Sequence, residues 1–86
     1  MKIILHRNFE KRYKKLRPSE KEKFKERRDL FLKNPFDPIL RNHPLGGPYK
    51  GFQSLDITGD LRVIYKQQDA DTAIFLFIDT HSNLYK

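Results

Sequence analysis

The sequence of 86 residues contains no cysteine and no tryptophan. Without cysteine the chain can form neither a disulfide nor a thiolate zinc site. It also lacks long apolar runs: the first one is only Ile3-Ile4-Leu5, whereas a membrane-spanning helix needs about 20 such residues and a signal peptide needs its own apolar core. We therefore expect one cytoplasmic domain over residues 1–86, with no membrane partner. A chain this short has little room to enclose a large cofactor, and none is expected.

Positive charge is concentrated in the first part of the chain. Residues 1–33 carry 13 basic and 5 acidic side chains, a net charge of +8, whereas residues 34–86 carry 5 and 6, a net charge of −1. A basic half of this kind favours a polyanionic partner, and nucleic acid is the first candidate. The alternative is a solvated helix surface whose charges only keep the protein soluble.

The apolar pattern predicts an α+β fold, with an N-terminal strand and a basic helical hairpin packed on a largely antiparallel sheet of about four strands. The strand is expected over residues 2–6. A first helix is expected to begin with Asn8 as its N-cap, and a second with Ser19, which is followed by Glu22 in a capping-box pattern. Asn34-Pro35 ends the second helix.

The second half of the chain predicts the rest of the sheet. Residues 34–48 hold four of the five prolines and are expected to be a connector. Strands are then expected over residues 49–56, 61–66 and 72–79, because the apolar period changes to two. The last of them is apolar throughout, so we expect it to be central and covered on both faces.

No local motif assigns a reaction. The chain has no HExxH, no Walker sequence and no GxSxG, and its three histidines are scattered. Polar side chains near the connector and the strand ends are nevertheless of the types that metal-free RNA cleavage needs: an acid, a base and a cation for the phosphate. These residues are His43, Lys50, Asp60, Arg62, His81 and Tyr85.

Five of these residues also have a structural interpretation. His43 can hydrogen-bond within a turn, and Asp60 is a typical turn residue. Arg62 can be an ordinary outward charge, and His81 can be an exposed residue of the tail. Tyr85 can anchor that tail in the core. Residue types alone leave both interpretations open.

Three sequence blocks add a stronger signal. Residues 42–52, 57–66 and 79–85 read NHPLGGPYKGF, ITGDLRVIYK and DTHSNLY. In order and spacing they resemble the RelE superfamily, and most closely its YafQ-type branch of type II toxin–antitoxin toxins. The basic N-terminal hairpin fits as well, so the resemblance covers nearly the whole chain.

The resemblance implies a toxin that is a ribosome-dependent, metal-independent endoribonuclease. Such a toxin cleaves mRNA in the ribosomal A site by attack of the 2′-OH, leaves a 2′,3′-cyclic phosphate and inhibits translation. Its expected partners are a cognate antitoxin protein, ribosomal RNA and mRNA. The fold that it implies is the small α+β domain already predicted from the apolar pattern.

The resemblance also implies roles for single residues. His81 matches the family's general acid, His43 and Asp60 match its base or base-orienting groups, Arg62 its phosphate clamp, and Tyr85 the aromatic that closes the site. No metal ligand is expected. The basic residues expected to bind RNA or the ribosome are Lys50, Lys11, Arg12, Lys15, Lys21, Lys25 and Arg28.

Some positions depart from the family pattern. Asp56 stands where YafQ-like members often carry histidine, and Leu61 where an aromatic is common. Phe77 and Ile78 stand where some relatives place a second arginine. These departures motivate the alternative of a non-catalytic toxin, a ParE-like toxin that inhibits gyrase, or a degenerate homologue that only binds an antitoxin.

Overall fold

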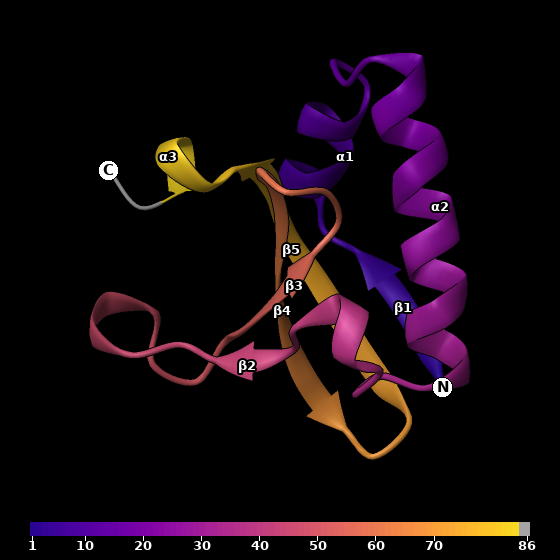
Figure 1. Ribbon diagram of the computed structural model, residues 1–86. Helices are drawn as coiled ribbons and strands as arrows, with labels where there is room; N and C mark the ends of the chain where they lie inside the picture. Colours follow the sequence, from indigo (N-terminus) through magenta and orange to yellow (C-terminus); the bar gives the residue numbers. More distant parts are fainter. Residues whose placement is uncertain (85–86) are drawn as a thin grey trace.

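The computed structural model describes residues 1–84 and arranges them around one five-stranded sheet (Figure 1). The strand order is β1-β5-β4-β3-β2; β1 runs parallel to β5, and all other neighbours are antiparallel. The predicted α+β fold with a largely antiparallel sheet is confirmed, with one more strand than expected. The strands are β1 (Lys2–Leu5), β2 (His43–Pro44), β3 (Gln53–Asp56), β4 (Leu61–Asp69) and β5 (Thr72–Thr80).

Both N-terminal helices begin before the predicted residues. His6, not Asn8, caps the first helix, because its Nδ1 accepts the Asn8 N–H at 3.1 Å. The second begins at Pro18, whose fixed φ suits the first helical position, and the Arg17 N–H donates to Glu20 Oε1 at 3.0 Å. The helices are α1 (Arg7–Tyr13), α2 (Pro18–Lys33), α3 (His81–Leu84) and the 3₁₀ turns η1 (Pro38–Leu40) and η2 (Gly47–Tyr49).

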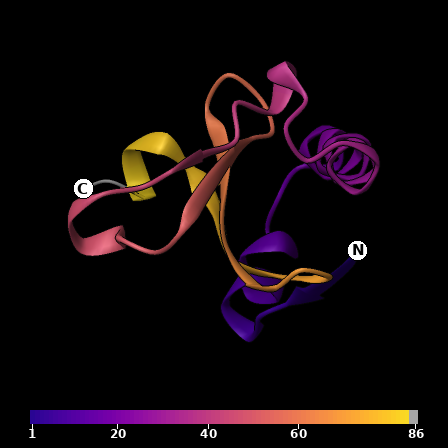
Figure 2. The ribbon, with the colours of Figure 1, turned by 90° about the horizontal axis from the view of Figure 1, so that it is seen from below.

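The core lies between the sheet and the first two helices. Figure 2 shows α2 end-on at one side of the sheet and α3 at the other. An aromatic cluster fills the space, with ring centroids of neighbouring pairs 5.2–6.2 Å apart, in the range where tilted and edge-to-face pairs are favourable. Its members, all at most 2% exposed, are Phe9, Phe24, Phe31, Tyr65 and Phe75.

The connector and the segment after it differ from the prediction. Of the predicted strand at residues 49–56, only Gln53–Asp56 is strand, because Gly47 (φ 58°) and Gly51 (φ 95°) turn the chain before it. The unpredicted β2 pairs with Ser54 and Gln53 at the sheet edge. It is only two residues long, and its proline is tolerated because the strand is an edge.

The last strand is central, as predicted, but it is covered on both faces only in part. β5 lies between β1 and β4, and a register shift between Ile64 and Tyr65 interrupts its pairing with β4. Phe75 is fully buried under the helices, whereas Phe77, on the opposite face, is 36% exposed. Where the sequence predicts a tail that leaves the sheet over residues 80–86, residues 81–84 form the short helix α3. Among residues 1–84, no helix is long and apolar enough to cross a membrane.

Candidate functional site

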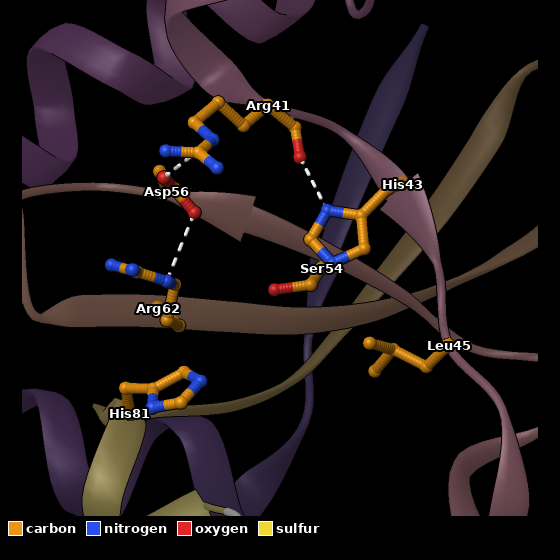
Figure 3. A pocket seen from close by; sticks show the side chains of 7 residues that line it. All are labelled: Arg41, His43, Leu45, Ser54, Asp56, Arg62 and His81. Carbon is orange, nitrogen blue, oxygen red and sulfur yellow. Dashed lines mark hydrogen bonds and ion pairs between the residues drawn. The ribbon is translucent and has the colours of Figure 1, made fainter.

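A pocket of about 340 Å³ opens on the sheet face opposite to α1 and α2 (Figure 3). Strand alternation explains its polar lining: Leu55 and Val63 point into the core, so their neighbours point the other way. The connector and the start of α3 complete the walls. The lining residues are Arg41, His43, Leu45, Ser54, Asp56, Arg62 and His81.

Asp56, one of the lining residues, lies between two arginines. Its Oδ1 is 2.9 Å from Arg62 Nε, its partner across the β3–β4 ladder, and its Oδ2 is 3.6 Å from Arg41 Nε. The side chains of Asp56 and Arg62 are only 14% and 16% exposed, whereas that of Arg41 is 76% exposed. The carboxylate therefore joins one enclosed cation to one solvated cation.

Arg62 is held by more than this ion pair. Its Nη1 donates to the Thr58 carbonyl at 2.9 Å and to the Gly59 carbonyl at 3.0 Å, both in the turn before β4. Two of the five guanidinium N–H groups thus donate to backbone carbonyls, and Nε forms the ion pair with Asp56. Arg62 is thus fixed in orientation, with its charge already balanced by a carboxylate.

His43 enters the pocket from β2. Its Nδ1 lies 2.6 Å from the Arg41 carbonyl oxygen. A carbonyl can only accept, so Nδ1 carries the proton in this contact, and the neutral ring has its lone pair on Nε2. Arg41 adopts the left-handed conformation (φ 47°), which is uncommon for a residue with a side chain.

His81 is the first residue of α3. Its backbone N–H donates to the Asp60 carbonyl oxygen at 2.8 Å, which ties the start of α3 to the tip of the β3–β4 hairpin. The other end of α3 is held by the Tyr49 hydroxyl, which donates to the Leu84 carbonyl at 2.9 Å. The position of His81 therefore depends on two loops that are distant in sequence.

The structure brings together three of the predicted catalytic residues: His43, Arg62 and His81 line the same pocket. Asp60 is exposed and does not line it; its backbone carbonyl, not its carboxylate, meets His81. Tyr85, the predicted aromatic of the site, lies outside the described residues.

Three polar residues of the lining were not predicted as site residues. Asp56 stood out only as a departure from a family pattern, and Arg41 and Ser54 did not stand out at all. One sequence feature could have indicated Asp56. Asp56 and Arg62 carry opposite charges on two strands joined by a short turn, an arrangement typical of a cross-strand pair. Nothing local in the sequence places Arg41 beside that pair.

The predicted RNA-binding cations fall into two groups. Arg12 on α1 donates to Asp79 Oδ1 at 2.9 Å, which docks the helix on the end of β5. Burial raises the pKa of Asp79, but hydrogen bonds from Arg12, Asn83 and the Thr80 N–H outweigh it, so the pKa lies below its usual value. This arginine has a structural partner and is not simply a charge offered to solvent.

Other cations of the helices are also engaged, though at the surface. Lys25 pairs with Glu22 at 3.4 Å, Arg28 pairs with Asp29 at 3.0 Å, and Lys21 lies 5.7 Å from the centre of the Tyr13 ring. Three predicted cations are exposed and have no ion pair or hydrogen bond with their side chains among residues 1–84. They are Lys11, Lys15 and Lys50.

The arrangement of histidine and acidic side chains also bears on metal binding. Within residues 1–84, no group of three or more of these side chains is placed to hold a metal ion. The polar side chains that line the pocket are two imidazoles, two guanidinium groups, one carboxylate and one hydroxyl.

Comparison with known proteins assigns the chain to a family. The family model described as the bacterial toxin of type II toxin–antitoxin systems, YafQ, matches residues 1–86. The chain belongs to the YafQ family. The resemblance inferred from the three sequence blocks is thereby confirmed, and it extends over the basic helices as well as over the pocket.

Solved structures agree in fold. The crystal structure of E. coli YafQ gives a TM-score of 0.83 at 24% identity, covering 99% of this chain and 98% of that one. YafQ in the E. coli DinJ–YafQ toxin–antitoxin complex gives 0.80 at 24% identity, with coverages of 99% and 97%. A copper-bound mutant toxin from Helicobacter pylori gives 0.75 at 29% identity, with 99% of both chains covered. Among curated proteins, none matches the sequence.

Proposed function

We propose that this YafQ-family toxin is an endoribonuclease that cleaves mRNA in the ribosomal A site without a metal ion. The observation that carries the proposal is the pocket, where His43 and His81 border the same cavity as two arginines. RNA cleavage by the 2′-OH needs a base, an acid and a cation, and these side chains can supply all three.

The reaction assigns one step to each histidine. His43 Nε2, left unprotonated by the Nδ1–H bond to Arg41, accepts the proton of the ribose 2′-OH. The 2′-oxygen then bonds to the adjacent phosphorus, and the bond from phosphorus to the 5′-oxygen breaks. His81 donates a proton to that leaving 5′-oxygen. The products are a 2′,3′-cyclic phosphate and a free 5′-hydroxyl, and the arginines stabilise the added negative charge on the phosphate.

Asp60 and Tyr85 have supporting roles in this proposal. Asp60 positions His81 through its backbone carbonyl, which accepts the His81 N–H at 2.8 Å. Tyr85 follows α3 in sequence, and an aromatic ring there can stack on a base.

The partners follow from charge and from the relatives. The net charge of +8 in residues 1–33 suits binding to ribosomal RNA. Binding to the ribosome then brings the pocket to the mRNA. The DinJ–YafQ complex shows a related toxin bound by its antitoxin. We propose that a cognate antitoxin likewise neutralises this protein.

Cleavage mapped by primer extension tests the proposal. Purified protein is incubated with mRNA, with and without programmed 70S ribosomes, in buffers of matched magnesium content. We expect cuts in the A site only when ribosomes are present. His43→Ala and His81→Ala should each lower the rate by about 100- to 10,000-fold, the usual contribution of a general acid or base.

The matched control is the histidine outside the pocket. His6 caps α1 through Nδ1, and asparagine can also cap, so His6→Asn should fold and cleave as the wild type does. A folded double variant, His43→Ala with His81→Ala, that still cleaves mRNA would contradict the assigned roles.

A second candidate function rests on the carboxylate in the pocket. Asp56 balances the charge of Arg62, and two N–H groups of that arginine already donate to backbone carbonyls. This favours a non-catalytic or ParE-like toxin if no other cation serves the phosphate. Expression in cells distinguishes the two candidates: DNA-damage signalling with intact mRNA indicates gyrase inhibition, and loss of mRNA indicates cleavage.

A further inference from the structure

The two arginines of the pocket differ in how available they are to a substrate. Arg62 is 16% exposed, forms an ion pair with a carboxylate and donates to two backbone carbonyls. Arg41 is 76% exposed, and its contact is the 3.6 Å pair with Asp56 Oδ2. Exposed pairs of this length contribute little stability, so Arg41 can exchange its carboxylate partner for another anion at small cost.

Arg41 is also the residue that fixes His43. Its carbonyl oxygen lies 2.6 Å from His43 Nδ1, while its side chain reaches Asp56 on the neighbouring strand. The left-handed backbone at φ 47° directs the carbonyl and the side chain into the same pocket. A residue with a side chain keeps this unfavourable conformation only where its surroundings hold it, and such positions often cluster at functional sites.

We infer that Arg41 binds the substrate phosphodiester next to His43, while Arg62 is the fixed support that holds Asp56. The inference rests on the proposed function and names a residue for its phosphate contact, in place of the predicted Arg62. With the phosphodiester bound, two guanidinium cations face one carboxylate and one phosphate anion, so the charges of this group balance. The planar fork of arginine suits two phosphate oxygens.

The same arrangement explains how the site works without the arginine that some relatives place late in the last strand. Phe77 and Ile78 occupy that region here, and neither can bind an anion. Arg41 approaches the pocket from the connector instead, on the same side as His43. Its solvated side chain can follow the phosphate as RNA enters, which the enclosed Arg62 cannot do.

Binding of a non-cleavable RNA tests the inference separately from cleavage. The probe is a short oligonucleotide with 2′-O-methyl riboses, titrated into the purified protein without ribosomes. We expect Arg41→Asn to weaken binding about tenfold or more, because it removes a charge-assisted contact. Asparagine tolerates the left-handed backbone, so the carbonyl contact with His43 should persist. Arg41→Lys, which keeps the charge without the fork, should restore part of the affinity.

Lys66→Gln is the control for loss of one positive charge, because Lys66 is exposed on β4 and lies outside both the pocket and the basic residues 1–33. It should bind the probe as the wild type does. A second readout follows the arginine Nε–H signals by NMR: the Arg41 signal should shift on titration, and more than that of Arg62. If Arg41→Asn binds as the wild type does, or if the wild type does not bind the probe, the inference is overturned.

Cleavage on ribosomes tests the proposed function separately. If the wild type binds the probe through Arg41 yet cleaves no mRNA on ribosomes, the phosphate contact stands and the endoribonuclease proposal fails. If the wild type cleaves and Arg41→Asn cleaves at the same rate, the endoribonuclease proposal stands and the inference about Arg41 fails.

Discussion

The two faces of the sheet are built by opposite rules. The face under α1 and α2 is an apolar layer in which aromatic rings pack against one another and every member is nearly inaccessible. The other face carries an ion pair, Asp56 with Arg62, that is about 15% exposed and borders an open pocket. Burial on the first face produces stability, whereas burial on the second holds charged groups in fixed positions.

Two arginine–aspartate ion pairs of equal N–O distance show the same contrast between stability and positioning. Arg12–Asp79 and Arg62–Asp56 are both 2.9 Å long. The first joins a helix to the sheet and is 24–36% exposed, so solvent screens it. The second is more enclosed and is extended by Arg41, so loss of its carboxylate would leave an enclosed cation unbalanced. An equal distance therefore does not imply an equal role.

The largest effect should come from a phenylalanine on the helix-covered face. Phe75 is fully buried, and Phe75→Ala should cost about 3–5 kcal/mol of unfolding free energy, a large share of the ~5–10 kcal/mol typical of such a domain. Phe77 is two residues along the strand, but the register shift between Ile64 and Tyr65 places it on the other face, where it is 36% exposed. Phe77→Ala should therefore cost only about 1 kcal/mol of unfolding free energy. Urea unfolding measures the loss of unfolding free energy in both variants. Equal losses would contradict the distinction between the two faces of the sheet.

How far the sequence predicts the fold depends on the range of the interactions. β4 was predicted because its residues alternate locally, β5 because it is a continuous apolar run, and the helices because their apolar residues recur on one side. The starts of the helices were misplaced because His6 and Arg17 are not typical caps. β2 was missed because a two-residue strand has no period to detect.

The site was predicted in part for the same reason. His43, Arg62 and His81, which line the pocket, were predicted because they stand in recognisable sequence blocks. Arg41 was not, because its role depends on a left-handed backbone and on a contact with Asp56, 15 residues further on in the sequence. Such a contact is set by the packing of the connector against the sheet edge, which neither residue type nor spacing specifies.

A smaller effect should appear at the helix-docking pair, and it should depend on pH. Because the folded pKa of Asp79 is lowered, its stabilising contribution is present above the usual value of 3.8 and is lost as the pH falls through the folded pKa. Asp79→Asn should therefore cost about 1 kcal/mol near neutral pH, a modest figure because Arg12 is 36% exposed, and almost nothing in strong acid.

Urea unfolding of the variant and the wild type at several pH values measures that difference. Asp71→Asn, which changes an exposed carboxylate in the β4–β5 turn, is the control and should give no pH-dependent difference. A cost for Asp79→Asn that stays constant from neutral pH into strong acid would show that the charge of Asp79 does not hold α1.

The smallest effect on stability should come from the exposed lysines of α1 and the segment after it, where binding should change instead. Lys11 and Lys15 are exposed, so the double variant Lys11→Gln with Lys15→Gln should change the unfolding free energy by less than about 0.5 kcal/mol.

If these lysines contact ribosomal RNA, each lost contact should reduce the slope of log K against log salt by about 0.7–0.9. Lys25→Gln, whose lysine already pairs with Glu22, should reduce it less. Ribosome binding measured at several salt concentrations compares these variants. An unchanged slope in the double variant would show that these lysines keep the protein soluble and do not contact ribosomal RNA. The binding surface would then be limited to the pocket.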